Sequence, residues 1–152
     1  MSTRQSHFLE ERVKRFIDVC RKKRLKATHQ RLVIYRAIAG SADHPSADMV
    51  YKEVRRQHPT VSLATVYKTL ETFKKVGLVS EVGPFHENTR YEANLAPHHH
   101  LICTQCKRIE DLYEPFLNAI PLPEQLKEHH VLGHTVWVHS LCRDCAKGRG
   151  KA

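Results

Sequence analysis

Two cysteine pairs, Cys103-x-x-Cys106 and Cys142-x-x-Cys145, constrain the fold of this 152-residue chain more than any other feature. Two such pairs bring four thiolates to one point, the ligand set that tetrahedral Zn²⁺ takes in closed structural sites. The intervening 35 residues exceed a compact zinc ribbon, so the metal would clamp the two ends of a small domain. Two disulfides or a dithiol redox motif are the alternatives, but the sequence has no cue for an oxidising compartment. A site filled by sulfur has no open coordination position, so the function must lie elsewhere.

Positive charge is concentrated in the first part of the chain. The sequence carries 25 Lys and Arg against 16 Asp and Glu, a net charge of +9. Residues 1–93 hold 18 basic and 10 acidic side chains (+8), whereas residues 94–152 hold 7 and 6 (+1). Clustered Lys and Arg neutralise phosphates, so the first part is the candidate nucleic-acid-binding half. A basic surface that only confers solubility would have the same charge.

The hydropathy pattern argues against a membrane protein. No apolar run approaches the roughly 20 residues that cross a bilayer. The charged N-terminal segment lacks the apolar core of an export signal. We therefore expect a cytoplasmic protein with no membrane partner.

Apolar periodicity and capping residues divide residues 1–93 into helices followed by strands. The predicted helices cover about 6–22, 29–39, 47–57 and 63–76, with Thr28, Ser46 and Ser62 as N-caps. Two strands are expected at 78–82 and 89–93, joined by a turn around Gly83-Pro84. This order is typical of a winged helix-turn-helix, whose last helix enters the DNA major groove and whose hairpin touches the backbone.

The helix over residues 63–76 is the candidate recognition helix. Its outward positions include Thr65, Tyr67, Lys68 and Thr69, whose side chains suit phosphates and base edges. A solvated helix face would have a similar composition. The order of elements and the charge asymmetry together favour DNA binding.

Beyond a short hinge at residues 94–97 the pattern changes to strands. Strands are predicted over 98–103, 108–112 and 134–141, with a proline-broken helical stretch over 114–130. The fold class is therefore mixed α/β (α+β), with a small C-terminal unit that zinc and a partner subunit would support.

Three consecutive histidines precede the first cysteine pair. Side chains alternate along a strand, so His98 and His100 point to one face and His99 to the other. Two imidazoles on one face are a bidentate metal site, and Glu92 and Asp111 are candidate carboxylate partners. This ligand set suits Fe²⁺, Mn²⁺ or Zn²⁺.

Several short motifs occur together in a specific order. They are Thr28-His29-Gln30-Arg31, His44-Pro45-Ser46-Ala47-Asp48, Ala64-Thr65-Val66-Tyr67-Lys68-Thr69-Leu70, Gly77-Leu78-Val79, Thr89-Arg90-Tyr91-Glu92, His98-His99-His100-Leu101-Ile102-Cys103 and the closing Cys142-x-x-Cys145. With this order and spacing, the chain resembles the ferric uptake regulator (Fur) family over nearly its whole length.

The resemblance implies a homodimeric, metal-dependent repressor that binds a double-stranded DNA operator. It implies a winged-helix domain at 1–93, a hinge at 94–97 and a metal-binding dimerisation domain at 98–152. The regulatory metal site that it implies consists of His44, Glu92, His98, His100 and Asp111. Because His44 lies before the hinge, metal binding would favour a closed dimer whose two recognition helices match adjacent major grooves.

Members of the family often hold a further metal site. His99 and His134 fall near its ligand positions, but Pro97 and Asn118 occupy the other two. We therefore do not predict this site here.

The branch of the family to which the chain is most similar indicates whether it would sense hydrogen peroxide or iron. The four cysteines and Asp111 resemble the peroxide-responsive (PerR) branch, whereas Glu92 resembles the iron-sensing branch. In the peroxide branch, Fe²⁺ reacts with H₂O₂ and oxygen is added to a ligand histidine, His44 or His98, so that DNA is released. Mn²⁺ would support DNA binding without that reaction. Iron sensing is the alternative, and zinc or another metal remains open.

A metalloenzyme and a structural zinc module are two alternatives to a regulator. A zinc metalloenzyme would need a general base and a substrate pocket, and the sequence has no His-Glu-x-x-His helix or similar signature. We therefore expect no enzymatic activity. A purely structural zinc module in nucleic-acid processing would bind DNA regardless of Mn²⁺ or Fe²⁺.

Overall fold

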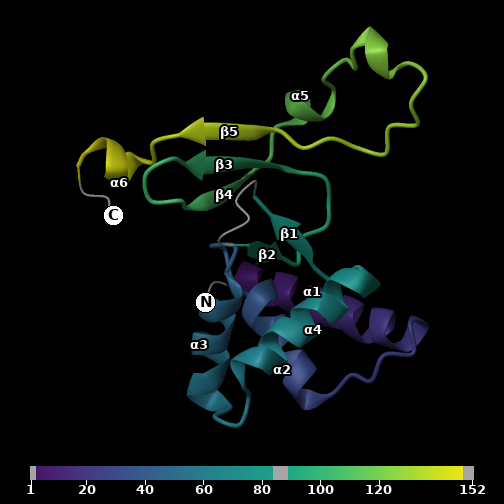
Figure 1. Cartoon of the computed structure of the whole chain (residues 1–152), viewed down its shortest axis with the longest axis vertical. Coiled ribbons are helices and arrows are strands. Elements are labelled where there is room, and N and C mark those ends of the chain that lie inside the picture. The colour runs from purple at the N-terminus through teal and green to yellow at the C-terminus, as the bar shows by residue number, and fades with distance from the viewer. Residues whose placement is uncertain (1–2, 84–88, 149–152) are drawn as a thin grey trace. The chain divides into compact units, whose positions relative to one another are not determined.

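Helices dominate the first half of the chain and a small sheet dominates the second (Figure 1). The computed structural model describes residues 3–83 and 89–148. It divides into two units, Met1–Leu95 and Ala96–Ala152. The expected fold class is confirmed, with a winged helix first and a mixed unit second. Within the described residues, no helix combines the length and the apolar character needed to span a bilayer.

Four helices form the body of the first unit, and three of them begin at a hydroxyl side chain. Thr28, Ser46 and Ser62 each accept a hydrogen bond from the backbone N–H three residues later, which satisfies one of the unpaired donors of the first turn. The last helix ends at Gly77, whose φ of 72° is the left-handed conformation that favours glycine. The helices are α1 (Thr3–Lys22), α2 (His29–Ala39), α3 (Ala47–Gln57) and α4 (Leu63–Val76).

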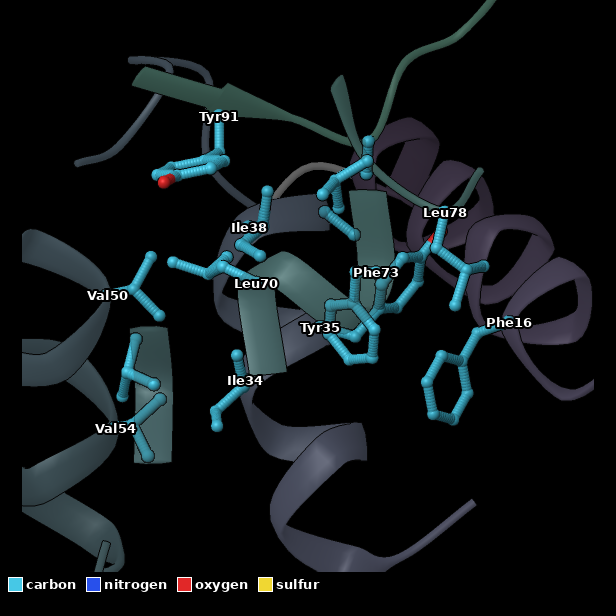
Figure 2. Packing of buried hydrophobic residues seen from close by; sticks show 14 of the residues in the cluster. Phe16, Ile34, Tyr35, Ile38, Val50, Val54, Leu70, Phe73, Leu78 and Tyr91 are labelled. Atoms are coloured by element: carbon cyan, nitrogen blue, oxygen red, sulfur yellow. The ribbon is translucent and has the colours of Figure 1, made fainter. Parts of the chain in front are cut away.

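An aromatic cluster holds α1, α2 and α4 together (Figure 2). Phe16 stacks on Tyr35 with ring centroids 5.0 Å apart, and Phe73 meets both rings edge-on at 5.8 Å. Such pairs add to the free energy of apolar burial. Phe16 and Cys20 define the buried face of α1, whereas the neighbouring Ile17 is 43% exposed.

The wing of the first unit is a short antiparallel pair, β1 (Ser80–Val82) and β2 (Arg90–Glu92). Both strands are shorter than predicted. Leu78 and Val79 are buried but lie before β1, where they close the core at the end of α4. Of the predicted turn, Pro84 lies outside the described residues.

The second unit is built on a three-stranded sheet with the order β4-β3-β5. The strands are β3 (His99–Cys103), β4 (Ile109–Leu112) and β5 (Trp137–Ser140). β3 pairs antiparallel with β4 and parallel with β5, and a single turn, α6 (Arg143–Ala146), follows β5.

The predicted helical stretch over 114–130 is largely irregular. It contains one helical turn, α5 (Pro115–Asn118), and one 3₁₀ turn, Glu124–Leu126. Pro121 and Pro123 lie between the turns, and proline has no backbone N–H to continue a helix. The predicted proline-broken helical stretch is therefore present only as these two short turns.

A buried hydroxyl in the aromatic cluster gives a test of the core. Tyr35 is fully buried, and among the described residues its Oη has no hydrogen-bond partner. A buried hydroxyl without a hydrogen-bond partner lowers the free energy of unfolding by about 1–3 kcal/mol. Tyr35→Phe should therefore raise the free energy of unfolding by about 1 kcal/mol in urea denaturation.

The matched control is Tyr51→Phe, which removes a hydroxyl that accepts a hydrogen bond of 2.8 Å from Arg55. This control should leave stability unchanged or lower it slightly. A clear loss of stability in Tyr35→Phe would show that the buried hydroxyl has a partner, such as an internal water.

Candidate metal centres

The four paired cysteines lie together at one end of the sheet of the second unit. Cys103 is the last residue of β3, and Cys106 lies in the turn that leads to β4. The parallel pairing of β3 with β5 places Cys103 opposite Ser140, so the chain leaving β5 reaches the same end with Cys142 and Cys145. One ligand atom from each cysteine lies within 4.8 Å of the others.

The spacing of the sulfur atoms fits a tetrahedral metal. The Sγ atoms of Cys106 and Cys142 are 3.7 Å apart, and the edge of a Zn–S₄ tetrahedron is about 3.8 Å for a Zn–S bond of about 2.3 Å. No disulfide joins any of the five cysteines. The two-disulfide alternative is therefore not realised, and the zinc site is the arrangement that the geometry supports.

Backbone hydrogen-bond donors lower the pKa of one thiol of this cluster, whereas burial and neighbouring sulfurs raise the pKa of another. The backbone N–H groups of Cys142 and Cys106 lower the pKa of Cys103 to about 6. Burial and the neighbouring cysteine sulfurs raise the pKa of Cys145 to about 12. Four thiolates cannot share this space without a compensating cation, and a bound dication supplies that charge.

A pair of candidate metal ligands, His44 and Glu92, lies in the first unit. The Nε2 atom of His44 is 3.4 Å from Oε2 of Glu92, and His44 is only 5% exposed. Ser80 donates a hydrogen bond of 2.9 Å to the other carboxylate oxygen of Glu92. Ser80 and Glu92 are cross-strand partners in the wing, so the hairpin itself orients the carboxylate.

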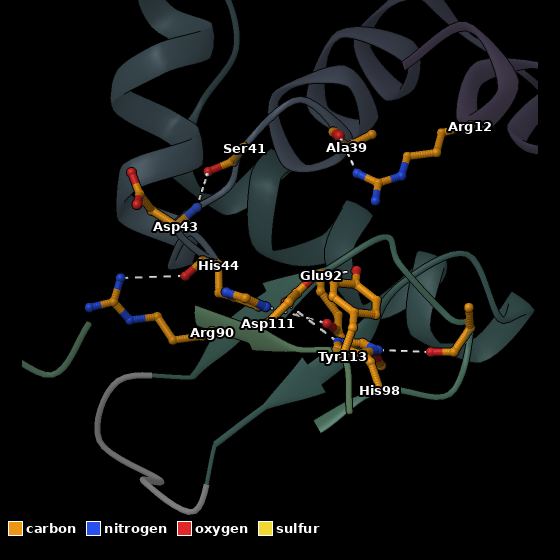
Figure 3. Close-up of polar contacts among 12 residues, drawn as sticks. Arg12, Ala39, Ser41, Asp43, His44, Arg90, Glu92, His98, Asp111 and Tyr113 are labelled. Atoms are coloured by element: carbon orange, nitrogen blue, oxygen red, sulfur yellow. Dashed lines mark hydrogen bonds and ion pairs between the residues drawn. The ribbon is translucent and has the colours of Figure 1, made fainter. Parts of the chain in front are cut away.

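The turn that carries His44 is fastened to β2. The backbone N–H of Tyr91 donates to the carbonyl of Pro45 at 3.0 Å, and Ser46 forms an isolated bridge with Arg90. Arg90 also donates to the carbonyl oxygen of His44 at 3.4 Å (Figure 3). His44 itself has a φ of 45°, a left-handed conformation that costs free energy in a non-glycine residue and persists only where the surroundings hold it.

Three further candidate ligands gather in the second unit. His98 lies just before β3, and the Nε2 atom of its ring is 3.5 Å from Oδ1 of Asp111. His100 is the direct cross-strand partner of Asp111, and its ring centroid is 4.5 Å from that of His98. Strand alternation thus places both imidazoles beside one carboxylate, as the sequence pattern predicted.

Neighbouring groups fix the orientation of these ligands. The Nδ1 atom of His98 is 2.8 Å from the carbonyl oxygen of Ala96. A carbonyl can only accept, so Nδ1 carries the proton and Nε2 presents its lone pair, as in metal-bound histidine. Tyr113 donates a hydrogen bond of 2.8 Å to Oδ2 of Asp111, and Trp137 stacks on His100 with centroids 4.5 Å apart.

His99 points away from His98 and His100 and contacts the backbone and another histidine of the second unit. Its Nδ1 atom accepts a hydrogen bond of 3.1 Å from the backbone N–H of Val136, and its ring stacks on His134. His134 in turn donates from Nε2 to the carbonyl of Leu117. Both rings are thus bonded to backbone groups, and neither belongs to a group of three or more metal-ligating side chains among the described residues.

The candidate DNA-binding residues on α4 differ in exposure. Tyr67 and Lys68 are exposed, as expected for outward positions, whereas Thr65 is half-buried. Thr69, which was also predicted to point outward, is only 7% exposed. It lies three residues after Val66 and four before Phe73, both fully buried, so it belongs to the edge of the core face.

The sequence did not identify the groups that orient the ligands. Ser80, Tyr113 and Trp137 support Glu92, Asp111 and His100 through contacts across strands or over short turns. Only the spacing of Asp111 and Tyr113, two residues apart on one side of an extended segment, was a usable signal. The other two contacts depend on strand register.

Comparisons with known proteins agree with this arrangement. The model of the ferric uptake regulator family matches residues 22–139. The peroxide-responsive repressor PerR of Staphylococcus aureus is 32% identical over 138 residues, which cover 90% of this chain and 93% of that protein.

Solved structures give the same result. The peroxide stress regulator of Campylobacter jejuni is 33% identical with a TM-score of 0.63, over 82% of this chain and 94% of that one. The ferric uptake regulator of Francisella tularensis, solved with iron, is 28% identical with a TM-score of 0.66, over 80% and 94%. The expected cofactors, zinc and a second metal such as iron, are confirmed as classes of ligand. The chain has a group of four cysteines suited to zinc and further imidazole and carboxylate side chains suited to iron or manganese. The chain belongs to the ferric uptake regulator family of metal-dependent regulators.

Proposed function

We propose that this chain is a homodimeric, metal-dependent repressor that binds double-stranded DNA and senses hydrogen peroxide. The observation that carries the proposal is the presence of two incomplete ligand sets, one in each unit. His44 and Glu92 form a buried pair in the first unit, and His98, His100 and Asp111 form a trio in the second. Neither set alone fills the coordination sphere of an iron or manganese ion.

One ion would take ligands from both sets. Three imidazoles and two carboxylates suit Fe²⁺ or Mn²⁺. Such an ion would link a winged-helix domain at 1–93 to a dimerisation domain at 98–152 across a hinge at 94–97. Metal binding then stabilises one hinge state over others, and DNA affinity depends on that state because two recognition helices must fit one operator.

The first unit has the features that DNA binding requires. Residues 1–93 carry a net charge of +8, and Tyr67 and Lys68 are exposed on α4. In a winged helix this helix reads base edges while surrounding cations contact phosphates.

The second unit has the features that a dimer requires. Several large apolar side chains of this small unit are exposed in the single chain, among them Phe116 (75%) and Leu132 (90%). A second copy of the chain would cover such a surface. The tetracysteine zinc would hold the sheet of each copy in shape.

Peroxide sensing is supported by the relatives named for peroxide response and by the complete set of four cysteines. The imidazole would be the net reductant: one oxygen atom of H₂O₂ would be added to a ligand imidazole and the other would leave as water, and bound Fe²⁺ would supply the chemistry that cleaves the O–O bond. His44 and His98 are the candidates. The alternative is an iron-responsive repressor, which the similarity to the iron-bound regulator favours. Neither reading includes steady enzymatic turnover.

The function can be tested with a DNA duplex selected from a random pool in the presence of Mn²⁺. The protein loaded with Mn²⁺ or Fe²⁺ should bind this duplex, and chelation should abolish binding. Dilute H₂O₂ should release the duplex only from the iron-loaded protein. Mass spectrometry should then find one added oxygen on the peptides that contain His44 or His98.

The exposed histidines His129 and His130 provide the internal control, because they should stay unmodified under the same conditions. Loss of DNA binding that requires iron but oxidises neither ligand peptide would refute the peroxide mechanism. Full binding that survives peroxide would instead support the iron-responsive alternative.

If the four cysteines hold a structural zinc ion, loss of one of them should disrupt the second unit. Cys103→Ser removes one of four ligands and leaves three thiols around an incomplete site. The variant should lose zinc and dimerisation and unfold in its second unit, since structural zinc contributes folding free energy directly. Cys20→Ser is the matched control, because Cys20 is buried in the first unit and belongs to no ligand cluster in the part of the chain that the structure describes. An intact dimer in Cys103→Ser would contradict the structural role.

The hydrogen bond from Tyr113 to Asp111 gives a second test of the ligand assignment. Tyr113→Phe should weaken Mn²⁺ binding about 10–100-fold, as loss of such outer contacts generally does. A competition titration with a metal indicator measures this affinity without DNA. Tyr51→Phe is the control for loss of a tyrosine hydroxyl, and zinc content should be unchanged in both variants. Unaltered Mn²⁺ affinity in Tyr113→Phe would remove Asp111 from the proposed ligands.

A further inference from the structure

A cavity of about 340 Å³ lies between α2 and α3 in the first unit, and a histidine lines it from each helix. His29 is the first residue of α2, and His58 is the residue that ends α3. Neither residue belongs to the candidate metal centres of either unit. The rest of the lining is aliphatic at Val33, Ala37 and Val54 and polar at Arg36, Glu53 and Gln57.

The two rings meet edge to face at a separation that suits a shared metal ion. Their centroids are 4.8 Å apart and their planes are inclined at 72°. An ion held by two imidazole nitrogens at about 2.0–2.1 Å, with an angle of about 90–110° at the metal, places the centroids about 4.5–5.2 Å apart. His98 and His100, the candidate ligands of the second unit, have nearly the same geometry, 4.5 Å and 69°.

A third histidine pair shows how a different arrangement looks. The rings of His99 and His134 are nearly parallel at 24°, with centroids 5.7 Å apart, and each ring bonds with a backbone group. Among the described residues, no hydrogen bond or ion pair engages the ring nitrogens of His29 or His58. These nitrogens are therefore available to a metal.

Backbone hydrogen bonds hold both histidines in place without the help of their rings. The side chain of Thr28 caps α2 directly before His29. The backbone N–H of His58 donates to the carbonyl of Val54 at 2.9 Å, and the carbonyl of His58 accepts from Val61 at 3.1 Å. An ion would therefore need to order only the two rings, which favours binding by both of them.

The charge around the two rings permits a cation. Glu53 offsets Arg36 in the lining of the cavity. His58 lies at the carbonyl end of α3, which carries a partial negative charge. Within the described residues no third histidine, cysteine or carboxylate joins the pair in a ligand cluster, so water would fill the remaining coordination positions.

We propose that His29 and His58 form an exchangeable, low-affinity site for a divalent zinc, nickel or copper ion. Imidazole suits these ions and binds Mn²⁺ more weakly. The site is independent of the proposed DNA binding and of the sensing metal. An ion at this place would fasten the start of α2 to the end of α3 and stabilise the first unit when such ions are abundant.

The test counts the zinc ions bound to the tag-free protein by equilibrium dialysis and elemental analysis. The wild-type chain should bind one zinc ion more than His29→Gln or His58→Gln, and the double variant should lose no further ion. Each single variant should bind this ion at least about 100-fold more weakly, because loss of a ligand has a larger effect than the 10–100-fold loss typical of a partner behind it. His130→Gln, which removes an exposed histidine of the second unit, should keep the wild-type count.

A second measurement uses the wild-type protein alone and so does not depend on the folding of a variant. In the ¹⁵N-labelled chain, Zn²⁺ should shift the imidazole nitrogen signals of both His29 and His58 and leave those of His130 in place. Equal zinc counts in the wild type and both single variants, or a loss that depends on only one of the two histidines, would overturn the proposal. Thermal stabilisation by inorganic phosphate without a difference in zinc count would show that the cavity takes an anion, and the proposal would be wrong.

Discussion

The four sulfur atoms at one end of the second unit fix the strand register on which its histidines depend. Cys103 ends β3 and Cys142 follows β5, so a metal bound by both holds the parallel strand pair at that end. The register of β3 then places His100 opposite Asp111 on β4. A slip of one residue would turn both imidazoles to the opposite face. The closed zinc site therefore determines the geometry of a chemically different set of ligands about one strand length away.

The first unit positions its ligands by another device. His44 sits in a strained turn between α2 and α3, and backbone contacts with β2 hold that turn beside Glu92. The wing is thus both a candidate DNA contact and the support of a proposed metal ligand. Any change that loosens the wing would also disturb His44, so under the proposed function metal occupancy and the conformation of the DNA-binding unit would be coupled through this hairpin.

Local signals in the sequence predicted much of the fold. The bounds of α3 and α4 agree with the prediction because Ser46, Ser62 and Gly77 act through hydrogen bonds and backbone conformations within a few residues. The cysteine cluster and the shared face of His98 and His100 follow from spacing and strand alternation. His44 has no local signature, and the support of Ser80 or Trp137 depends on pairings between distant segments. Thr69 was misplaced because helical periodicity alone does not show where the edge of a core lies.

The distribution of charge limits how metal can control DNA binding. Residues 1–93 carry +8 whether or not a metal is bound, so electrostatic attraction to phosphate persists in the metal-free protein. One divalent ion adds two positive charges to the protein. Under the proposed function these charges would lie beside the carboxylates of Glu92 and Asp111, whose negative charges largely offset them. Attraction of this kind therefore cannot act as the switch. What metal can change is the probability that two recognition helices in a dimer are held at the spacing of one operator. Under the proposed function, affinity for the correct site would then respond to metal, whereas the general affinity for DNA would not.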